Sequence, residues 1–182
     1  MEARRESEHT PMKNRTTVER KSERELVVTR TFNGPGHIVF EAWTRPELLR
    51  RWWAPKSFGV SFISCDADVR AGGTYRFVFG HPASEQPMEF FGRYIEVTPH
   101  SRLVRTNEEG GEGGAVTTVT FEERGAETLV VMHDLYPSKE ALDGAIASGS
   151  TCGFSETFEQ LDELLVTLGA SVRRLKGTSL ES

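Results

Sequence analysis

Apolar and polar residues alternate along much of the chain, which is typical of β-strands with one buried face. In the segment 74–80, for example, Tyr75, Phe77 and Phe79 fall on the same face. Seven segments predict strands: 24–32, 58–70, 74–80, 88–99, 102–107, 115–123 and 127–135. Because most connections between them are short and contain Gly or Pro, the pattern predicts an antiparallel meander.

Helical spacing interrupts this alternation between the first and second predicted strands. Val39 and Trp43 lie four positions apart, on one face of a first short helix. Thr44 and Glu47 have the spacing of a capping box, and Pro46 falls in the first turn of a second helix, where its missing N–H is harmless. We therefore predict two short helices after the first strand.

One long amphipathic helix is predicted near the C-terminus. Its apolar positions recur at intervals of three and four over about four turns, at Phe154, Phe158, Leu161, Leu165 and Leu168. Such a stripe needs a sheet to lie on. The predicted fold class is α+β, with a curved antiparallel sheet of about seven strands wrapped around the long C-terminal helix.

The two ends of the chain have little apolar content. Residues 1–23 mix acidic and basic side chains, so they bury too little surface to offset the entropy of ordering, and we predict a disordered tail. Residues 171–182 are predicted to form a C-terminal tail. The segment between them, 24–170, is predicted to be a single domain, which suits a chain of 182 residues.

Charge and composition exclude several classes of protein. The net charge of −5 supplies no global basic field for nucleic acid. The apolar runs are far shorter than the roughly 20 residues that span a bilayer, and the first residues lack the apolar stretch of a signal peptide. Cys65 and Cys152 form no disulfide framework. These features predict a cytoplasmic protein without membrane insertion.

All three tryptophans lie within eleven positions, at 43, 52 and 53. The spacing assigns them to the two short helices, where they mainly fill volume. Because Trp52 and Trp53 are adjacent, their side chains must point in different directions. One of the two can line a cavity while the other anchors the helix, and the sequence leaves this choice open.

Several separated motifs carry a family resemblance. They are Arg30, Phe32, Pro35, Val39, Phe40, Ala42 to Thr44, Pro46, Leu49, Trp52, Trp53 and Pro55, then DVRAGGTYRF (68–77), GRYIEVTPHSRLV (92–104) and Gly153-Phe154. Over about residues 24–168 the chain resembles the helix-grip superfamily of birch-pollen-allergen-like and steroidogenic-acute-regulatory-related lipid-transfer proteins. The branch it resembles is homologous to the C-terminal domain of the activator of the heat-shock-chaperone ATPase. Phe154 departs from the tryptophan that the family more often has there.

The resemblance implies a protein that binds a small apolar or amphipathic ligand between the sheet and the C-terminal helix. The residues predicted to line this cavity are Trp52, Phe77, Phe79, Phe90, Tyr94, His133, Phe154 and Phe158. A protein-interaction module with a chaperone as partner is the first alternative. The activator has a separate N-terminal domain, and only a short polar segment precedes the domain here, which favours ligand binding. A cyclase- or hydrolase-type enzyme using the same cavity is the further alternative.

Candidate chemistry is sparse. His133 and Asp134 are adjacent on a predicted strand and face opposite sides, so they form no direct dyad. Asp66 and Asp68 share a strand face, and a structural role explains them more simply than catalysis. The histidines lie at 9, 37, 81, 100 and 133 without a metal-binding motif. We predict no catalytic residue, metal site or cofactor, and favour a binding role over an enzyme.

Three arginines fall within predicted strands: Arg30, Arg93 and Arg105. An arginine that points inward would provide a fixed charge for an anionic ligand. Strand arginines more often extend to solvent or pair with a glutamate on the neighbouring strand. The sequence leaves their directions open.

Overall fold

The computed structural model describes residues 15–108, 114–149, 151 and 153–178. Within these residues it has eight strands: β1 (Thr17–Arg20), β2 (Glu25–Phe32), β3 (Ser61–Ala67), β4 (Thr74–His81), β5 (Ser84–Thr98), β6 (Arg102–Thr106), β7 (Val116–Arg124) and β8 (Glu127–Leu135). The helices are α1 (Gly36–Thr44), α2 (Pro46–Trp52), the 3-10 helix η1 (Lys56–Phe58), α3 (Lys139–Ala147) and α4 (Phe154–Thr178).

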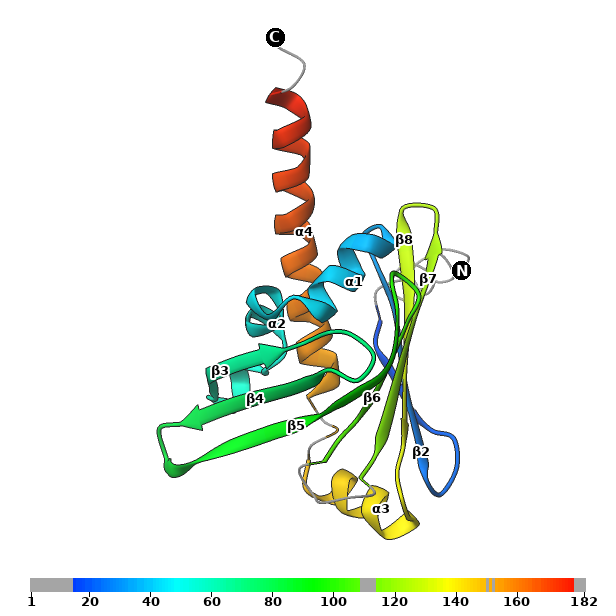
Figure 1. The fold of residues 1–182 in the computed structure, drawn as a ribbon, viewed down its shortest axis with the longest axis vertical. Coiled ribbons are helices and arrows are strands. Elements are labelled where there is room, and N and C mark those ends of the chain that lie inside the picture. Colours follow the sequence, from blue (N-terminus) through cyan, green and yellow to red (C-terminus); the bar gives the residue numbers. More distant parts are fainter. Residues whose placement is uncertain (1–14, 109–113, 150, 152, 179–182) are drawn as a thin grey trace, which may run out of the picture.

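All eight strands form one antiparallel sheet in the order β1-β2-β8-β7-β6-β5-β4-β3. The last six strands are a meander, and β2 closes against β8 after the chain has returned from the other edge. Helices α1, α2 and α4 lie on one side of this sheet, called here the inner side (Figure 1). The predicted α+β helix-grip class is confirmed, with one strand more than expected.

The additional strand is β1, which lies in the segment predicted to be disordered. Its residues pair with β2 from Thr17 opposite Thr29 to Arg20 opposite Leu26. All four side chains are exposed, so backbone pairing carries the strand. The predicted disorder is therefore wrong for residues 17–20, and residues 1–14 lie outside the described part of the chain.

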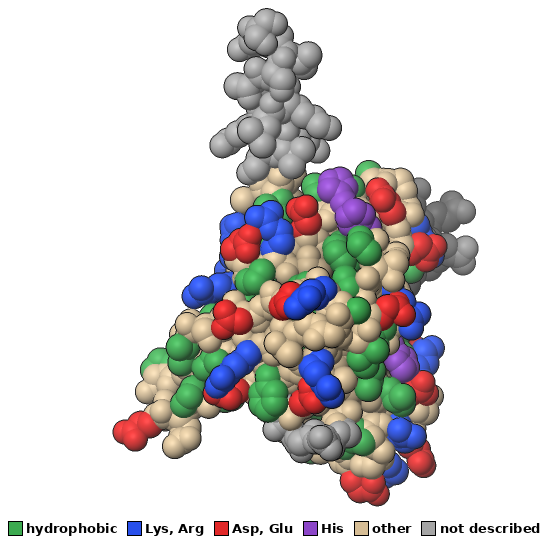
Figure 2. Space-filling view, viewed as in Figure 1, with side chains coloured by type: hydrophobic (Ala, Val, Ile, Leu, Met, Phe, Trp, Pro, Cys, Tyr) green, Lys and Arg blue, Asp and Glu red, His purple; other side chains and the backbone are tan. Residues whose placement is uncertain are grey.

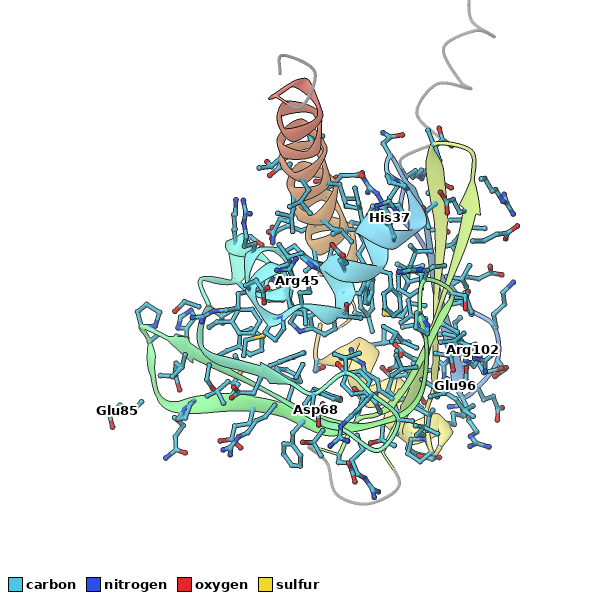
Figure 3. All side chains as sticks on the ribbon, turned by 45° about the horizontal axis from the view of Figure 1, so that its top comes forward. His37, Arg45, Asp68, Glu85, Glu96 and Arg102 are labelled. Carbon is cyan, nitrogen blue, oxygen red and sulfur yellow. The ribbon has the colours of Figure 1, made fainter. Side chains whose placement is uncertain are left out.

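The β4–β5 hairpin projects from the rest of the sheet (Figure 1). Strand β5 begins at Ser84, four residues before the predicted start, and Glu85 lies at the tip of the hairpin (Figure 3). The strand predicted from residue 58 begins only at Ser61, because Phe58 belongs to η1 and Gly59 has a left-handed backbone, with φ of 69°. This 3-10 turn places Phe58 beside the hairpin.

The two short helices form as predicted, but the capping box does not. Pro46 occupies the first turn of α2, as expected, and Arg45 is the N-cap without a side-chain capping bond. The Thr44 hydroxyl instead donates a hydrogen bond to the Phe40 carbonyl oxygen in α1, at 2.9 Å. The two helices therefore follow one another with a sharp change of direction at Arg45, which is labelled in Figure 3.

The apolar stripe of α4 faces the interior. Phe158 and Leu161 are buried, whereas Glu159 between them is exposed. The Phe158 ring packs on Phe32 of β2 with 5.4 Å between centroids. The helix continues to Thr178, so residues 171–178 of the predicted C-terminal tail extend α4. Residues 179–182 lie outside the described part.

Helix α3 has no counterpart among the predicted elements. Its N-cap is Ser138, whose side chain accepts a hydrogen bond from the Ala141 backbone N–H at 3.1 Å. Leu142 is its one buried residue. A helix with a single buried side chain has no apolar stripe, which explains why periodicity did not predict it.

Candidate functional site

Most of the side chains predicted to line a cavity are buried on the inner side of the sheet. These are Trp52, Phe77, Phe79, Tyr94 and Phe158. Strand alternation brings Phe77, Phe79 and Tyr94 to the same face, because Phe77 and Phe79 are two residues apart on β4 and Tyr94 follows on β5. The interior they form is tightly packed with aromatic rings.

The two adjacent tryptophans have separate positions. Trp52 is 1% exposed, and its Nε1 donates a hydrogen bond to the Ala42 carbonyl oxygen at 2.9 Å, which ties α2 to α1. Trp53 is only partly buried and meets the Phe77 ring at 5.5 Å between centroids. Trp53, not the predicted Trp52, is therefore the tryptophan that reaches the inner face of β4.

Gln160 of α4 fixes the backbone around Trp53. Its Nε2 donates to the carbonyl oxygens of Trp52 at 3.0 Å and Ala54 at 2.9 Å. Its Oε1 accepts from the Lys56 backbone N–H at 3.0 Å. A buried side-chain amide with these three bonds holds the chain on both sides of Trp53 and so orients the indole.

His133 does not belong with the other predicted cavity residues. On β8 the buried residues Met132 and Asp134 alternate with it, so its side chain lies on the outer side of the sheet. There its Nε2 is 2.9 Å from Glu25 Oε1, and this contact lowers the pKa of the Glu25 carboxyl. The assignment of His133 to the cavity was wrong, since one residue of strand register decides the face.

Phe90 and Phe154 lie at the margins of the inner face. Phe90 pairs with Phe77 across β4 and β5 and contacts the Phe79 ring at 5.5 Å, yet it is 40% exposed. Phe154 opens α4, is partly buried, and its ring centroid is 6.5 Å from that of Phe158. Both contact the buried aromatic interior from its rim.

An open pocket of about 370 Å³ lies between η1 and the projecting hairpin. Its lining residues are Phe58, Val60, Phe79, His81, Ser84, Gln86 and Met88. Phe79 is the one predicted cavity residue among them. Phe58 and Met88 are about half exposed, and hydrophobic side chains are visible along this hairpin in Figure 2. The pocket thus continues the inner face of β4 toward solvent.

A row of polar side chains crosses the inner face at the other end of β4. Tyr94, Arg105, Thr117 and Asp134 are direct cross-strand neighbours on β5, β6, β7 and β8. The next row on the same face is apolar, with Val97, Leu103, Val119 and Met132. Polar groups inside a protein cost free energy unless they are paired, so this row requires an explanation.

Arg105 is the charged member of this polar row. Its guanidinium carbon lies 4.7 Å from the centroid of the Trp53 ring and 4.9 Å from that of Tyr75, which are cation–π distances. Its Nε is buried and has no hydrogen-bond partner among the residues that the structure describes. The side chain as a whole is only partly buried. Arg105 therefore presents an interior positive charge with an unused donor.

The polar groups around Arg105 are occupied by one another. Tyr75 Oη donates to the Thr106 carbonyl oxygen at 2.7 Å, and Asn107 Nδ2 donates to Thr117 Oγ1 at 2.9 Å. Thr117 Oγ1 in turn donates to Asp134 Oδ1 at 2.5 Å. This chain of bonds stabilises the polar row without engaging the guanidinium.

Burial shifts the pKa values of two members of the row. Removal from water raises the pKa of the Asp134 carboxyl, although the Thr117 hydrogen bond and the charge of Arg105 oppose the shift. Burial also raises the pKa of the Tyr94 phenol. Both shifts disfavour the charged forms of these two side chains.

The other arginines considered from the sequence are already paired. Arg30 is buried and forms an ion pair with Asp162 of α4. Arg93 extends to solvent, where its Nη2 is 3.3 Å from Glu108 Oε1. Asp68 binds the Arg70 Nε at 2.8 Å in the β3–β4 connection, which supports the structural interpretation of that carboxylate.

Among the described residues, no group of three or more His, Cys, Asp or Glu side chains could hold a metal ion. None of the helices in that part of the chain has both the length and the apolar composition needed to cross a membrane.

The polar row could have been predicted from the alternation of side chains along β6 and β8. Arg105 has the same parity as Leu103, which belongs to the core, and Asp134 has the same parity as Met132 and Val130. If the apolar positions of a strand face inward, polar residues two positions away must do so as well. The contact of Arg105 with Trp53 could not be foreseen in this way, because it joins a strand to a helix end.

Comparison with known proteins places the chain in a family. The sequence profile of the family described as "Activator of Hsp90 ATPase homolog 1-like protein" matches residues 33–166. No curated protein matches the chain. Among solved structures, a Rhodobacter sphaeroides protein is similar with a TM-score of 0.76 and 24% identity over 84% of this chain and 99% of its own.

Two further solved structures are similar to this chain. A Staphylococcus epidermidis protein has a TM-score of 0.69 and 27% identity, covering 83% of this chain and 94% of its own. A protein of Aeromonas hydrophila, described as AHSA1-like, has a TM-score of 0.62 and 16% identity over 76% of this chain and 93% of its own. With most of the chain matched by the family profile, this protein belongs to the family of activator of Hsp90 ATPase homolog 1-like proteins.

Proposed function

We propose that the protein binds a small amphipathic molecule on the inner side of the sheet. The observation that carries this proposal is that one face of β4 runs from the polar surroundings of Arg105 to the apolar open pocket. Tyr75, Phe77 and Phe79 share the inner face of β4, with Tyr75 under Arg105 and Phe79 in the open pocket. Tyr75 and Phe79 are four residues apart, or about 13 Å along the strand.

This arrangement matches a molecule with one apolar and one polar end. The pocket beside Phe79 would take the apolar part, since Phe58 and Met88 leave apolar surface exposed there. Ligand sites are commonly apolar concavities with a few placed polar groups. Trp53 lies over Phe77 between the two environments, so its indole would have to shift for a single ligand to span them.

Titration with Nile red, a neutral environment-sensitive dye, tests the proposal. We expect saturable binding to the folded protein and a marked loss of affinity in Met88→Glu, because a charge in the pocket opposes an apolar ligand. Phe91→Glu is the matched control: Phe91 lies on the same strand, faces the other side and is similarly exposed. Equal effects of the two substitutions, or no saturable binding, would contradict the proposal.

A second candidate function is protein interaction. It is favoured by exposed apolar side chains on both faces of β5, with Met88 on the inner face and Phe91 and Ile95 away from it. The family description names an activator of the Hsp90 ATPase. Measuring ATP hydrolysis by an Hsp90-type chaperone with and without this protein tests the role. A stimulated rate that Phe91→Glu abolishes would support it.

A further inference from the structure

The hydrogen-bond donors of Arg105 indicate which polar group a bound ligand would carry. Among the described residues, its Nε has no partner, and its guanidinium forms none of the ion pairs found elsewhere on the protein. Arg30 and Arg93, on other strands of the same sheet, are both paired with carboxylates. Within the described part of the chain, Arg105 is thus a strand arginine without a carboxylate partner.

The neighbours of Arg105 offer no substitute for that partner. The rings of Trp53 and Tyr75 cover the guanidinium carbon at 4.7 and 4.9 Å, which stabilises the charge but accepts none of its N–H groups. Asp134 lies two strands away, about 10 Å between backbones, and its Oδ1 is engaged by Thr117. Asn107 Oδ1 is 3.2 Å from Tyr75 Oη, which shares its one proton between this oxygen and the Thr106 carbonyl oxygen.

We propose that Arg105 binds the carboxylate of a small amphipathic organic acid. The N–H groups of a guanidinium lie in its plane and match the two oxygens of a carboxylate. Because the rings of Trp53 and Tyr75 cover the guanidinium carbon, an acceptor reaches these N–H groups from the edge. This inference rests on the proposed binding function and specifies the chemistry of the ligand.

A matched pair of fluorescent probes tests the inference: 1-pyrenebutyric acid and 1-pyrenebutanol, which share the fluorophore and chain and differ in the charged group. We expect the acid to bind about ten- to a hundredfold more tightly to the full-length protein, as charge-assisted hydrogen bonds in a partly dry site require. Arg105→Gln should bring the two affinities together by weakening acid binding alone.

Two further variants isolate the role of Arg105. Arg93→Gln removes the same charge from a neighbouring strand on the outer side, and should leave both affinities unchanged. Arg105→Lys keeps the charge without the planar donor set, and should recover part of the preference for the acid. Circular dichroism and cooperative unfolding would establish that each variant is folded.

The outcomes separate the two proposals. Equal affinity of the wild-type protein for acid and alcohol would overturn the carboxylate inference and leave amphipathic binding intact; this comparison needs no variant to fold. Loss of the acid preference in Arg93→Gln as well would attribute it to net charge and overturn the role of Arg105. Binding of neither probe would contradict the proposed function itself.

Discussion

The inner side of the sheet has two halves with similar aromatic content and different openness. The helix half lies under α4 and is built around Phe32, Trp43, Trp52 and Phe158. The hairpin half is built around Trp53, Tyr75, Phe77, Phe79 and Arg105. Each half leaves one buried N–H without a partner among the described residues, Trp43 Nε1 and Arg105 Nε.

The difference between the halves is charge and access. Trp43 is neutral and 4% exposed, and aromatic rings surround it. Arg105 carries a charge, keeps part of its surface exposed, and belongs to a face that continues into an open pocket. Aromatic rings alone therefore indicate only a core. A charged donor without a partner among the described residues, on a face that continues into an open pocket, supports the proposed binding site.

The largest effect is expected in the helix half. Leu161→Ala should lower the free energy of unfolding by about 2–5 kcal/mol, because Leu161 is fully buried and its truncation leaves a cavity. Glu159→Ala, on the exposed face of the same helix, should change it by less than about 0.5 kcal/mol. Chemical denaturation measures both, and equal losses would show that α4 does not pack through this face.

A second prediction concerns the boundary between the halves. Phe77 is 0% exposed and packs against the rings of Trp53, Tyr75 and Phe62. Phe77→Trp should therefore overpack the interior and lower the free energy of unfolding by about 1–3 kcal/mol. An unchanged stability on chemical denaturation would mean that the hairpin half contains room which the packing of Phe77 does not suggest.

The third prediction concerns pH. The pKa of Asp134 in the folded protein lies above its ordinary value of 3.8 because burial disfavours the carboxylate. Its contribution to stability is therefore fully present below the unfolded pKa and is lost as pH rises through the folded pKa. Asp134→Asn removes this dependence, so the variant should gain stability relative to the wild type as pH rises.

Denaturation from about pH 3 to about pH 8 would measure that difference. Thr117→Val is a useful companion, since it removes the hydroxyl that donates to Asp134 and should raise the carboxyl pKa further. A stability difference between Asp134→Asn and wild type that is constant with pH, or that falls with rising pH, would contradict the assignment.

The smallest effect is expected on the outer side. His133→Gln should leave the affinity for Nile red unchanged, because His133 contacts Glu25 on the face opposite Met132. A weakened dye affinity in a folded variant would mean that the two sides of β8 are coupled. The same dye titration used for the pocket residues supplies the measurement.

Element prediction succeeded where one face of the element is buried. Two such patterns are the alternation of Tyr75, Phe77 and Phe79 and the stripe from Phe158 to Leu165. Each belongs to a continuous buried surface, and burial requires apolar side chains at these positions. β1 and α3 lack such a surface: β1 is exposed on every side chain, and α3 buries Leu142 alone. Backbone pairing with β2 stabilises β1, and the Ser138 cap stabilises α3. Neither interaction requires apolar residues at regular intervals in the sequence.

The candidate site was predicted in part. Phe77 and Phe79 share one inner face, as their spacing indicated, and the register between β4 and β5 brings Tyr94 to the same face. His133 was assigned to that face wrongly. Trp52 is buried on the inner side, where it is tied to α1, and the adjacent Trp53 is the one that meets Phe77. For Trp52 the choice between adjacent residues depends on how α2 rotates against α1 and α4. For His133 the assignment depends on which residues of β8 point inward. Because the neighbouring Met132 is apolar and points inward, the alternation of side chains along the strand could have predicted that His133 points outward.

The sequence by itself determined the order of β2 to β8 and of α1, α2 and α4, the α+β class and the aromatic character of the inner side, because these follow from the local periodicity of apolar side chains. Only the tertiary structure decided that Arg105 lies against the rings of Trp53 and Tyr75 and has no carboxylate partner among the residues described. That contact joins the residue that caps the C-terminus of α2 to residues of β4 and β6, which are close only after the sheet curves and Gln160 fixes the chain around Trp53. Periodicity is a property of neighbouring residues, whereas the environment of a charge is set by everything that packs around it.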